Sequence, residues 1–193
     1  MKTIPLVLSV IIFIVGPVFA SPVQWAGNNH WYDLVYLDPV LDWEDAREMA
    51  ENDGGYLVTL INEDENDFVW NFLKTATNLN DTGYEAYWLG GYQTSYDNEP
   101  DGDWAWVTGE EWAYTNWLPD EPNNGRDGTQ HYLHYWGTDS GEFDDMENGR
   151  YMAGYVVEFD SEPIPEPAIS LLLVSGLILL IGIKRKDLPK NFF

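Results

Sequence analysis

The chain of 193 residues contains no cysteine. Disulfide bridges, thiolate metal ligands and a cysteine nucleophile are therefore all excluded. Basic residues are almost as scarce, since between the two apolar ends of the chain the only ones are Arg47, Lys74, Arg126 and Arg150. A formal net charge of −24 predicts a surface that repels nucleic acid and attracts divalent cations. A solvated acidic coat explains most single carboxylates equally well.

Long apolar runs occur only near the two ends. Residues 1–20 carry one Lys, an apolar stretch and small residues before Ser21, which is the layout of a secretory signal peptide. A second uncharged run ends in Lys184-Arg185-Lys186, so residues 168–186 are predicted to form a C-terminal transmembrane helix with its basic end in the cytoplasm. The run is short for a span, roughly 24 Å at about 1.5 Å per residue, and a buried core helix is the alternative.

Residues 21–160 are predicted to form one globular domain, followed by a proline-rich linker at 161–167 and, after the transmembrane helix, a polar tail at 187–193. All 10 Trp residues fall between Trp25 and Trp136. Because aromatic side chains bury large areas, they can build the core of an exported domain that has no bridges.

The local pattern predicts an α+β fold, with two helices beside a mainly antiparallel sheet. Asp42 is a candidate N-cap for a helix over 43–52, and Asn62, with Glu65 three residues on, opens a helix over 62–74. The composition of 97–148 shifts to Asp, Glu, Gly, Pro and Trp, which indicates a long irregular loop region. The predicted strands are 30–36, 56–60, 86–92, 104–106, 131–135 and 154–159.

Two polar clusters stand out within this loop region, Glu121-Pro122-Asn123 and Phe143-Asp144-Asp145. A carboxylate offers only acceptors, whereas an amide offers an acceptor and two donors. Glu121 beside Asn123 could therefore coordinate a hard cation and also hold a pair of hydroxyls. The chemistry suggested is recognition of a sugar diol through calcium.

An enzyme is a weaker interpretation. Asp144 and Asp145 with His131 or His134 could act as acid and base, and a glycosidase needs two carboxyls about 5 to 10 Å apart. However, the sequence has no nucleophile motif, phosphate-binding loop or zinc-type histidine pair. We expect the two histidines to be packing or edge residues of a strand, and we predict no catalysis.

Residues 28–160 resemble the C-type lectin-like domain. The stretches 43–55, 88–91, 104–109 and 114–117 agree with the family pattern in order and spacing, and Glu121-Pro122-Asn123 is the calcium and sugar tripeptide of the family. The resemblance implies a calcium site formed by Glu121, Asn123, Asp144 and Asp145, with Pro122 in the cis form. It also implies sugars with equatorial diols, such as mannose or glucose.

The sequence departs from that family at several positions. The usual cysteines are replaced by Ala50, Tyr132, Glu147 and Val157, and the usual Trp-Asn-Asp by Phe143-Asp144-Asp145. The change to Asp144 keeps an oxygen ligand but removes an amide donor. A further acidic ligand is replaced by Gln130, and Asp127 is its candidate substitute.

The same resemblance suggests an auxiliary calcium site at Asp97, Asp101 and Asn124. Residues 97–102 are, however, all turn-forming types, and a plain turn is the favoured alternative.

The C-terminal end resembles the PEP-CTERM sorting signal of Gram-negative bacteria, through Pro165-Glu166-Pro167, the apolar run and the basic stop. That signal implies processing by an exosortase in the inner membrane, and it accompanies exopolysaccharide production. The protein is thus predicted to be an exported lectin, anchored first in the inner membrane and then placed at the cell surface or in the matrix. The alternative is a calcium-independent adhesion or protein-interaction module.

Overall fold

The sheet is built from strands that come from both ends of the domain and from its middle. The computed structural model describes residues 21–36, 41–77, 86–136, 141–149 and 152–164. The strands are β1 (Val23–Gln24), β2 (Trp31–Tyr36), β3 (Tyr56–Leu57), β4 (Tyr87–Gln93), β5 (Trp104–Trp106), β6 (Gln130–Tyr135), β7 (Phe143–Glu147) and β8 (Gly154–Phe159). Their order is β1-β2-β8-β4-β6-β7, with β3 on β8 and β5 on β4. Every pair is antiparallel except β4 with β8.

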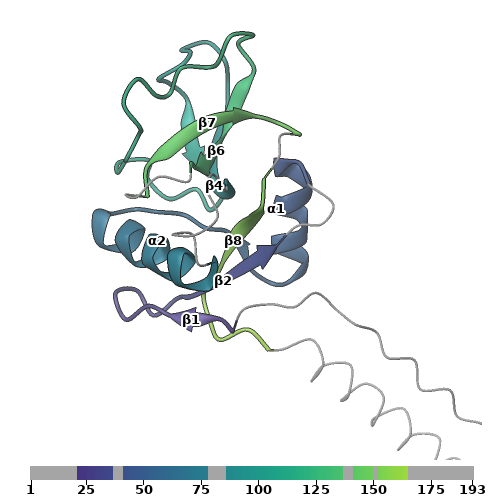
Figure 1. Ribbon diagram of the computed structural model, residues 1–193, viewed down its shortest axis with the longest axis vertical. Helices are drawn as coiled ribbons and strands as arrows, with labels where there is room; N and C mark the ends of the chain where they lie inside the picture. The colour runs from purple at the N-terminus through teal and green to yellow at the C-terminus, as the bar shows by residue number, and fades with distance from the viewer. Residues whose placement is uncertain (1–20, 37–40, 78–85, 137–140, 150–151, 165–193) are drawn as a thin grey trace, which may run out of the picture.

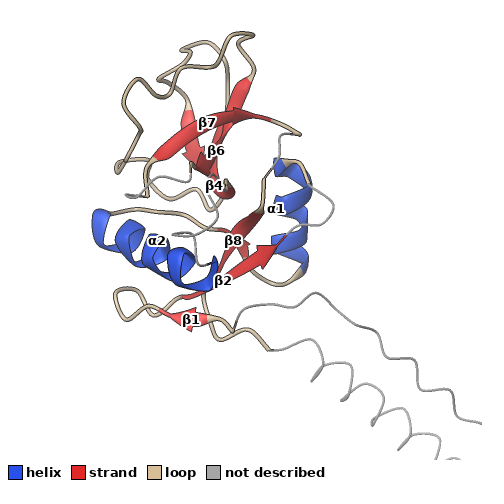
Figure 2. Ribbon diagram, in the orientation of Figure 1, coloured by secondary structure: helices blue, strands red, loops and turns tan. Residues whose placement is uncertain are grey.

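The sheet divides the domain into two halves (Figures 1 and 2). One half holds β1, β2, β8 and the two helices, and the other holds β6, β7 and the long loops. Within the described residues, the first and last segments lie together at the end of the domain opposite these loops. The loop region is therefore presented away from the chain ends.

Helix α1 (Trp43–Asn52) begins as the sequence predicts. The Asp42 side chain accepts a hydrogen bond from the Asp45 backbone N–H at 2.9 Å, which satisfies one of the free donors of the first turn. Trp43, Ala46 and Ala50 form its buried face. Gly54 follows the helix with a φ of 84°, a conformation that glycine adopts without a steric penalty.

Helix α2 (Glu63–Thr77) is capped by Asn62, whose side chain accepts from the Glu65 N–H at 2.9 Å, as predicted. It continues three residues past the predicted end, because no glycine or proline stops it there. Its fully buried apolar residues are Val69, Trp70 and Leu73. Phe68 and Phe72 of the same helix are partly buried and pack against the core.

Two hydrophobic clusters form the core, and aromatic side chains supply much of both. One cluster includes Leu34, Val69 and Leu89, and the other includes Ala50 and Val157. Ala50 and Val157, which the resemblance places at cysteine positions of the family, are thus buried in the same apolar cluster.

The predicted strand over 56–60 is shorter in the structure. After Leu57 the chain leaves β8, and residue Val58 bonds on both sides: its N–H donates to Val156 and its carbonyl accepts from Gly90. The segment therefore bridges β8 and β4 instead of extending either pairing.

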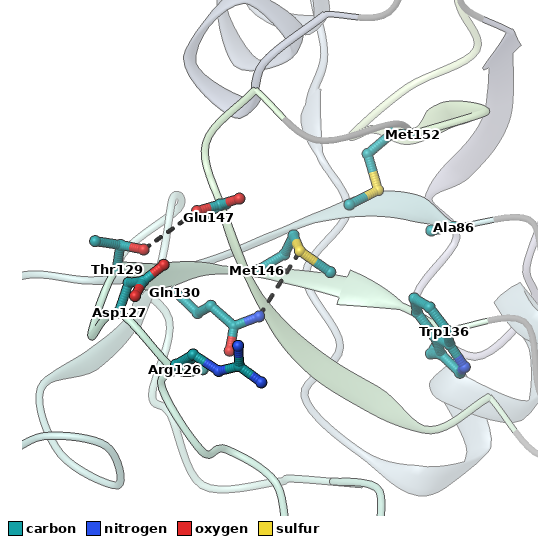
Figure 3. Close-up of a pocket in the computed structure, with 10 residues that line it drawn as sticks. Ala86, Arg126, Asp127, Thr129, Gln130, Trp136, Met146, Glu147 and Met152 are labelled. Atoms are coloured by element: carbon teal, nitrogen blue, oxygen red, sulfur yellow. Dashed lines mark hydrogen bonds between the residues drawn. The ribbon is translucent and has the colours of Figure 1, made fainter.

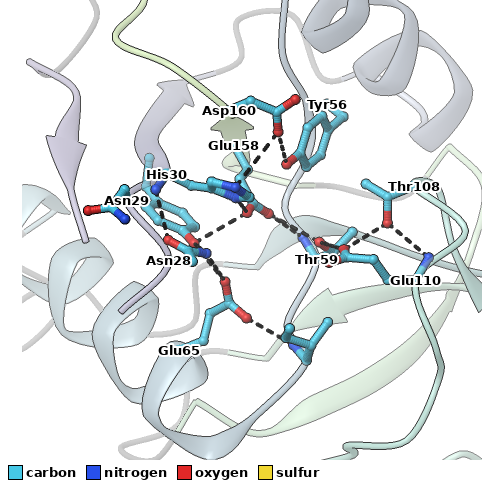
Figure 4. Close-up of polar contacts among 12 residues, drawn as sticks. Asn28, Asn29, His30, Tyr56, Thr59, Glu65, Thr108, Glu110, Glu158 and Asp160 are labelled. Atoms are coloured by element: carbon cyan, nitrogen blue, oxygen red, sulfur yellow. Dashed lines mark hydrogen bonds and ion pairs between the residues drawn. The ribbon is translucent and has the colours of Figure 1, made fainter. Parts of the chain in front are cut away.

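Two carboxylates are buried where α2 meets the sheet, and Figure 4 shows their contacts. The Glu65 side chain is 1% exposed and accepts hydrogen bonds from the Tyr32 hydroxyl (2.7 Å), the Asn28 amide (2.8 Å) and the Ile61 N–H (3.0 Å). Such donors offset the cost of removing a carboxylate from water. Burial raises the pKa of Glu65 nonetheless.

Glu158 is the second buried carboxylate, at 2% exposure. It accepts from the Thr59 N–H at 3.0 Å, and its Oε1 lies 2.6 Å from His30 Nδ1. Burial raises the pKa of Glu158 to about 6. Burial alone would lower the pKa of His30, but the hydrogen bond and charge of Glu158 outweigh it and raise that pKa.

Of the predicted segments, the signal peptide at 1–20, the transmembrane helix at 168–186 and the tail at 187–193 lie outside the described residues, and so do residues 165–167 of the linker. In the part of the chain that is described, no helix has the length and apolar character needed to cross a bilayer.

A candidate cation and carbohydrate site

The loop that carries Glu121 is fixed to the start of β7. The N–H of Leu118 donates to the Phe143 carbonyl at 2.9 Å, and the N–H of Phe143 donates to Asn116 at 2.7 Å. The Glu121–Pro122 bond is cis, as the family resemblance implies. These contacts place the tripeptide beside the Asp144-Asp145 pair, which is far from it in the chain.

Three carboxylates meet at this point. Glu121, Asp144 and Asp145 each offer an oxygen, and these oxygens all lie within 4.8 Å of one another. Asp145 is fully buried, whereas the Asp144 side chain is 14% exposed and Glu121 is half-buried. We call these three residues the acidic cluster.

Hydrogen-bond donors reach the acidic cluster from one side. Asp145 accepts from the backbone N–H groups of Asn123 (2.9 Å) and Asn124 (2.7 Å). The Asn123 amide donates to Glu121 Oε1 at 2.6 Å, and its own oxygen accepts from the Gly125 N–H. Glu121 Oε2 is buried without a hydrogen-bond partner, which is unusual for a carboxylate oxygen.

Positive charge near the acidic cluster is sparse. Among the described residues, the basic side chain within ion-pair distance is His134, whose Nε2 lies 3.4 Å from Asp144 Oδ2. Burial, together with the neighbouring carboxylates of Asp145 and Asp144, raises the pKa of Glu121 to about 8. Three acids this close are stable either with a shared proton or with a bound cation.

The donor set fits calcium. The ion takes six to eight oxygen ligands from carboxylates, amide oxygens and water, and it does not require an ideal geometry. The three carboxylates of the acidic cluster are of this kind, and they are held by the Glu121 loop and β7. Asn123 turns its amide nitrogen toward Glu121 and its oxygen toward the Gly125 N–H, so its role as a calcium ligand stays a prediction.

The other two predicted ligands line a neighbouring pocket (Figure 3). Asp127 and Gln130 are among its lining residues. The Gln130 N–H donates to Asn124 Oδ1 at 2.9 Å, and its side-chain amide contacts the Met146 sulfur at 3.8 Å. Asp127 is not one of the three carboxylates that converge. As calcium ligands, both residues stay predictions.

The turn that carries Asp97 and Asp101, predicted for an auxiliary calcium site, is organised around a different residue. Hydrogen bonds in the turn converge on Asp103, which accepts from the Ser95 hydroxyl at 2.8 Å and the Asn98 amide at 2.9 Å. Asp97 and Asp101 are exposed. Asn124 lies in the other loop, after Asn123. Its side-chain oxygen accepts from the Gln130 N–H, and its own N–H donates to Asp145. The turn alternative accounts for these contacts without a metal.

His131 and His134 of β6 pack against aromatic rings, as expected, and each also has polar partners. The Nδ1 of His131 lies 3.0 Å from Gln93 Oε1, and that of His134 lies 2.9 Å from the Tyr135 carbonyl. His134 is fully buried with its ring edge-on to Trp88, and His131 stacks on Tyr96 with ring centroids 4.0 Å apart. The buried Glu65 and Glu158 were not anticipated. The signal available in the sequence is that Glu158 interrupts an otherwise apolar strand, which indicates a charged group inside the core.

A mixed sheet flanked by two helices, with a cis Glu-Pro-Asn loop facing a pair of aspartates, defines a C-type lectin-like domain. Residues 40–150, more than half of the chain, match the family model described as Lectin C-type domain, so the chain belongs to this family of carbohydrate-binding domains. The family is in general not enzymatic.

Similar proteins include a perlucin-like protein of Mytilus galloprovincialis, 28% identical over 116 residues that cover 60% of this chain and 68% of the relative. The cow CD23 carbohydrate-recognition domain, solved in the presence of a GlcNAc2Man3 oligosaccharide, is 25% identical with a TM-score of 0.51, over 67% of this chain and 86% of that one. A calcium-independent type II antifreeze protein (17% identity, TM-score 0.52, 72% of this chain and 95% of that one) shares the fold.

Proposed function

We propose that the protein binds a polysaccharide through a calcium ion held by Glu121, Asn123, Asp144 and Asp145. The observation that supports this most strongly is the convergence of three carboxylates with sparse positive charge around them and one buried oxygen without a partner. A divalent cation neutralises that charge and gives the oxygen a partner, in place of a proton shared with Asp145 or Asp144.

The bound ion would leave coordination positions for two neighbouring sugar hydroxyls. Each hydroxyl binds the ion through its oxygen and donates its hydrogen to a carboxylate. With an aspartate at position 144, the sugar meets an acceptor where an asparagine would donate. The hydroxyl on that side must therefore act as a donor. By family resemblance, the preferred sugars have equatorial diols, as in mannose or glucose.

The location that goes with this function is also a proposal. A signal peptide at 1–20 and a PEP-CTERM-type anchor at 168–186 would export the protein and hold it in the inner membrane until an exosortase releases it. A lectin domain delivered in this way meets surface and matrix polysaccharide.

The second candidate is a calcium-independent adhesion module, and one observation favours it. With the pKa of Glu121 raised to about 8, that carboxyl keeps its proton at neutral pH, and the acidic cluster then holds together without a metal. The fold also occurs in a calcium-independent antifreeze protein.

Calcium-dependent retention on a sugar column separates the two candidates. The full-length chain is passed over mannose-agarose and glucose-agarose in millimolar calcium, and a chelator is then applied. We expect retention in calcium and release by the chelator. Retention that survives chelation would favour the adhesion module. If Glu121→Gln loses retention and the neighbouring exposed-acid variant Asp120→Asn keeps it, the interaction takes place at the acidic cluster.

A further inference from the structure

The pocket in Figure 3 is lined by residues of β6 and β7, and β7 also carries Asp144 and Asp145 of the acidic cluster. In the pairing of these strands, Tyr132 faces Met146 and His134 faces Asp144. Side chains two residues apart in a strand share a face, so Met146 stands on the same face as Asp144. Met146 lines the pocket, and Asp144 belongs to the acidic cluster. A ligand held at the cluster can therefore extend over Met146.

The lining of the pocket changes from apolar to polar along its length. Trp136, Met146 and Met152 line one part, and Arg126, Asp127 and Gln130 line another. The volume is about 380 Å³, within the range of roughly 300 to 1,000 Å³ that is usual for small-molecule sites. A sugar ring has the same two-sided character, because its C–H groups pack on an indole and its hydroxyls reach polar groups.

Two charged groups of the pocket are available to a ligand. Arg126 and Asp127 are exposed, and within the described residues neither makes a hydrogen bond or an ion pair. By contrast, Arg47 pairs with Glu51 at 2.8 Å. The guanidinium of Arg126 can donate to sugar hydroxyls and the carboxylate of Asp127 can accept from them. Oxygen Oε1 of Gln130 has no partner, but it is buried beside Gly125.

We propose that this pocket is a second subsite, which binds the sugar residue next to the one held at the acidic cluster. The proposal rests on the calcium-dependent function above and names its ligand class: a neutral oligosaccharide or polysaccharide of hexoses. Arg126 is outnumbered here by Asp127, Glu147 and the three acids of the cluster. Acidic chains would be repelled by that charge, whereas neutral chains would not.

Chain length tests the proposal directly. Mannose and mannotriose are titrated into the full-length protein in millimolar calcium, and their dissociation constants are measured by calorimetry. We expect mannotriose to bind at least tenfold more tightly than mannose, a difference of about 1.4 kcal/mol. A trimannuronate of the same length, which carries a carboxylate on each ring, is expected to bind more weakly than mannotriose.

Two variants locate the extra affinity. Trp136→Ala removes the apolar platform, and we expect it to lower mannotriose affinity about tenfold while mannose affinity changes less than twofold. Because Trp136 is half-buried, Arg126→Ala at an exposed position serves as the second variant, with an expected threefold loss for mannotriose alone. Arg47→Ala, at a basic residue on α1, is the matched control and should change neither constant.

The outcomes separate this inference from the proposed function. Calcium-dependent mannose binding with no gain for mannotriose, or with equal losses for both sugars in the variants, overturns the second subsite and leaves the first. Tighter binding of trimannuronate overturns the neutral ligand class. If neither sugar binds in calcium, the proposed function and the subsite both fail.

Discussion

The domain holds two groups of acidic side chains that are treated in opposite ways. Glu65 and Glu158 are buried among donors, with Tyr32, Asn28 and Ile61 on the first and Thr59 and His30 on the second. The acidic cluster receives two backbone N–H groups and one amide, places its carboxylates against one another, and leaves Glu121 Oε2 without a partner.

The difference separates acids that the fold itself satisfies from the acids for which we propose a bound cation. The buried pair is satisfied by the protein, so it contributes to the fold without needing anything from solution. The acidic cluster is not satisfied, since three acids share few donors and sparse positive charge. The comparison predicts that a substitution which removes charge from the buried pair lowers the free energy of unfolding. In the acidic cluster, such a substitution should leave the metal-free stability nearly unchanged and lower stability only when calcium is present.

The largest expected effect is on the buried pair. Glu65→Ala removes the acceptor of the Tyr32 hydroxyl, the Asn28 amide and the Ile61 N–H. The buried Tyr32 hydroxyl then keeps only a longer contact to Glu158, at 3.3 Å, and a buried donor without a good partner costs about 1–3 kcal/mol. We expect the free energy of unfolding to fall by about 3 kcal/mol or more, measured by urea denaturation. Asp67→Ala, an exposed acid on the same helix, should change it by less than about 0.5 kcal/mol, and equal effects would break the comparison.

The acidic cluster should respond in the reverse manner. Glu121→Gln is expected to change the stability of the metal-free protein by less than about 1 kcal/mol, because the pKa of Glu121 is raised to about 8 and the amide then replaces a carboxyl that is already mostly neutral at pH 7. The same variant should lower calcium affinity about a hundredfold, equivalent to about 2.7 kcal/mol, in calorimetric titrations. A large loss of metal-free stability would show that this cluster is structural after all.

The pH dependence of stability sharpens the comparison further. The folded protein raises the pKa of Glu158 to about 6, whereas in the unfolded chain this pKa has its ordinary value of 4.5. Between these two pH values, the folded protein therefore holds a proton that the unfolded chain has released. This contribution is complete below about pH 4.5 and is lost as the pH rises through about 6. The raised pKa of His30 acts in the same direction, with its contribution present below 6.5 and lost above.

Asp33, whose pKa burial raises to about 7, acts in the same direction, so we expect stability to fall by on the order of 3 kcal/mol between pH 5 and pH 7 in the Glu121→Gln background. Adding Glu158→Gln should reduce that fall by about 1 kcal/mol in denaturant titrations at the two pH values. A slope unchanged by the second substitution would mean that Glu158 does not hold the proton.

The smallest effect concerns the exposed turn at 94–103. Asp97→Asn and Asp101→Asn are expected to change calcium affinity by less than twofold, because the hydrogen bonds of this turn converge on Asp103. A tenfold or greater loss in either variant would instead support the auxiliary calcium site.

Features set by neighbouring residues were predictable from the sequence. The caps at Asp42 and Asn62 and the α+β order follow from local patterns, and the cis Glu121–Pro122 bond follows from family resemblance. Features set by distant partners were not. The early end of β3 depends on Val58 bonding to two strands, and the burial of Glu65 depends on Tyr32.

The site shows the same division. Resemblance grouped Glu121 with Asp144 and Asp145, and the structure brings these three side chains together. It could not place Gln130, because the path of the loop after Asn124 decides whether that side chain faces the acidic cluster or the pocket.

Thermal unfolding of the full-length protein in millimolar calcium and in chelator tests the central claim most directly. A ligand that binds only the native state stabilises it by about 2.7 kcal/mol at a hundred times its dissociation constant, so the midpoint should rise by several degrees in calcium. The rise should persist in Asp120→Asn and disappear in Glu121→Gln. Identical melting curves for the unmodified protein in calcium and in chelator would contradict a cation site at the acidic cluster.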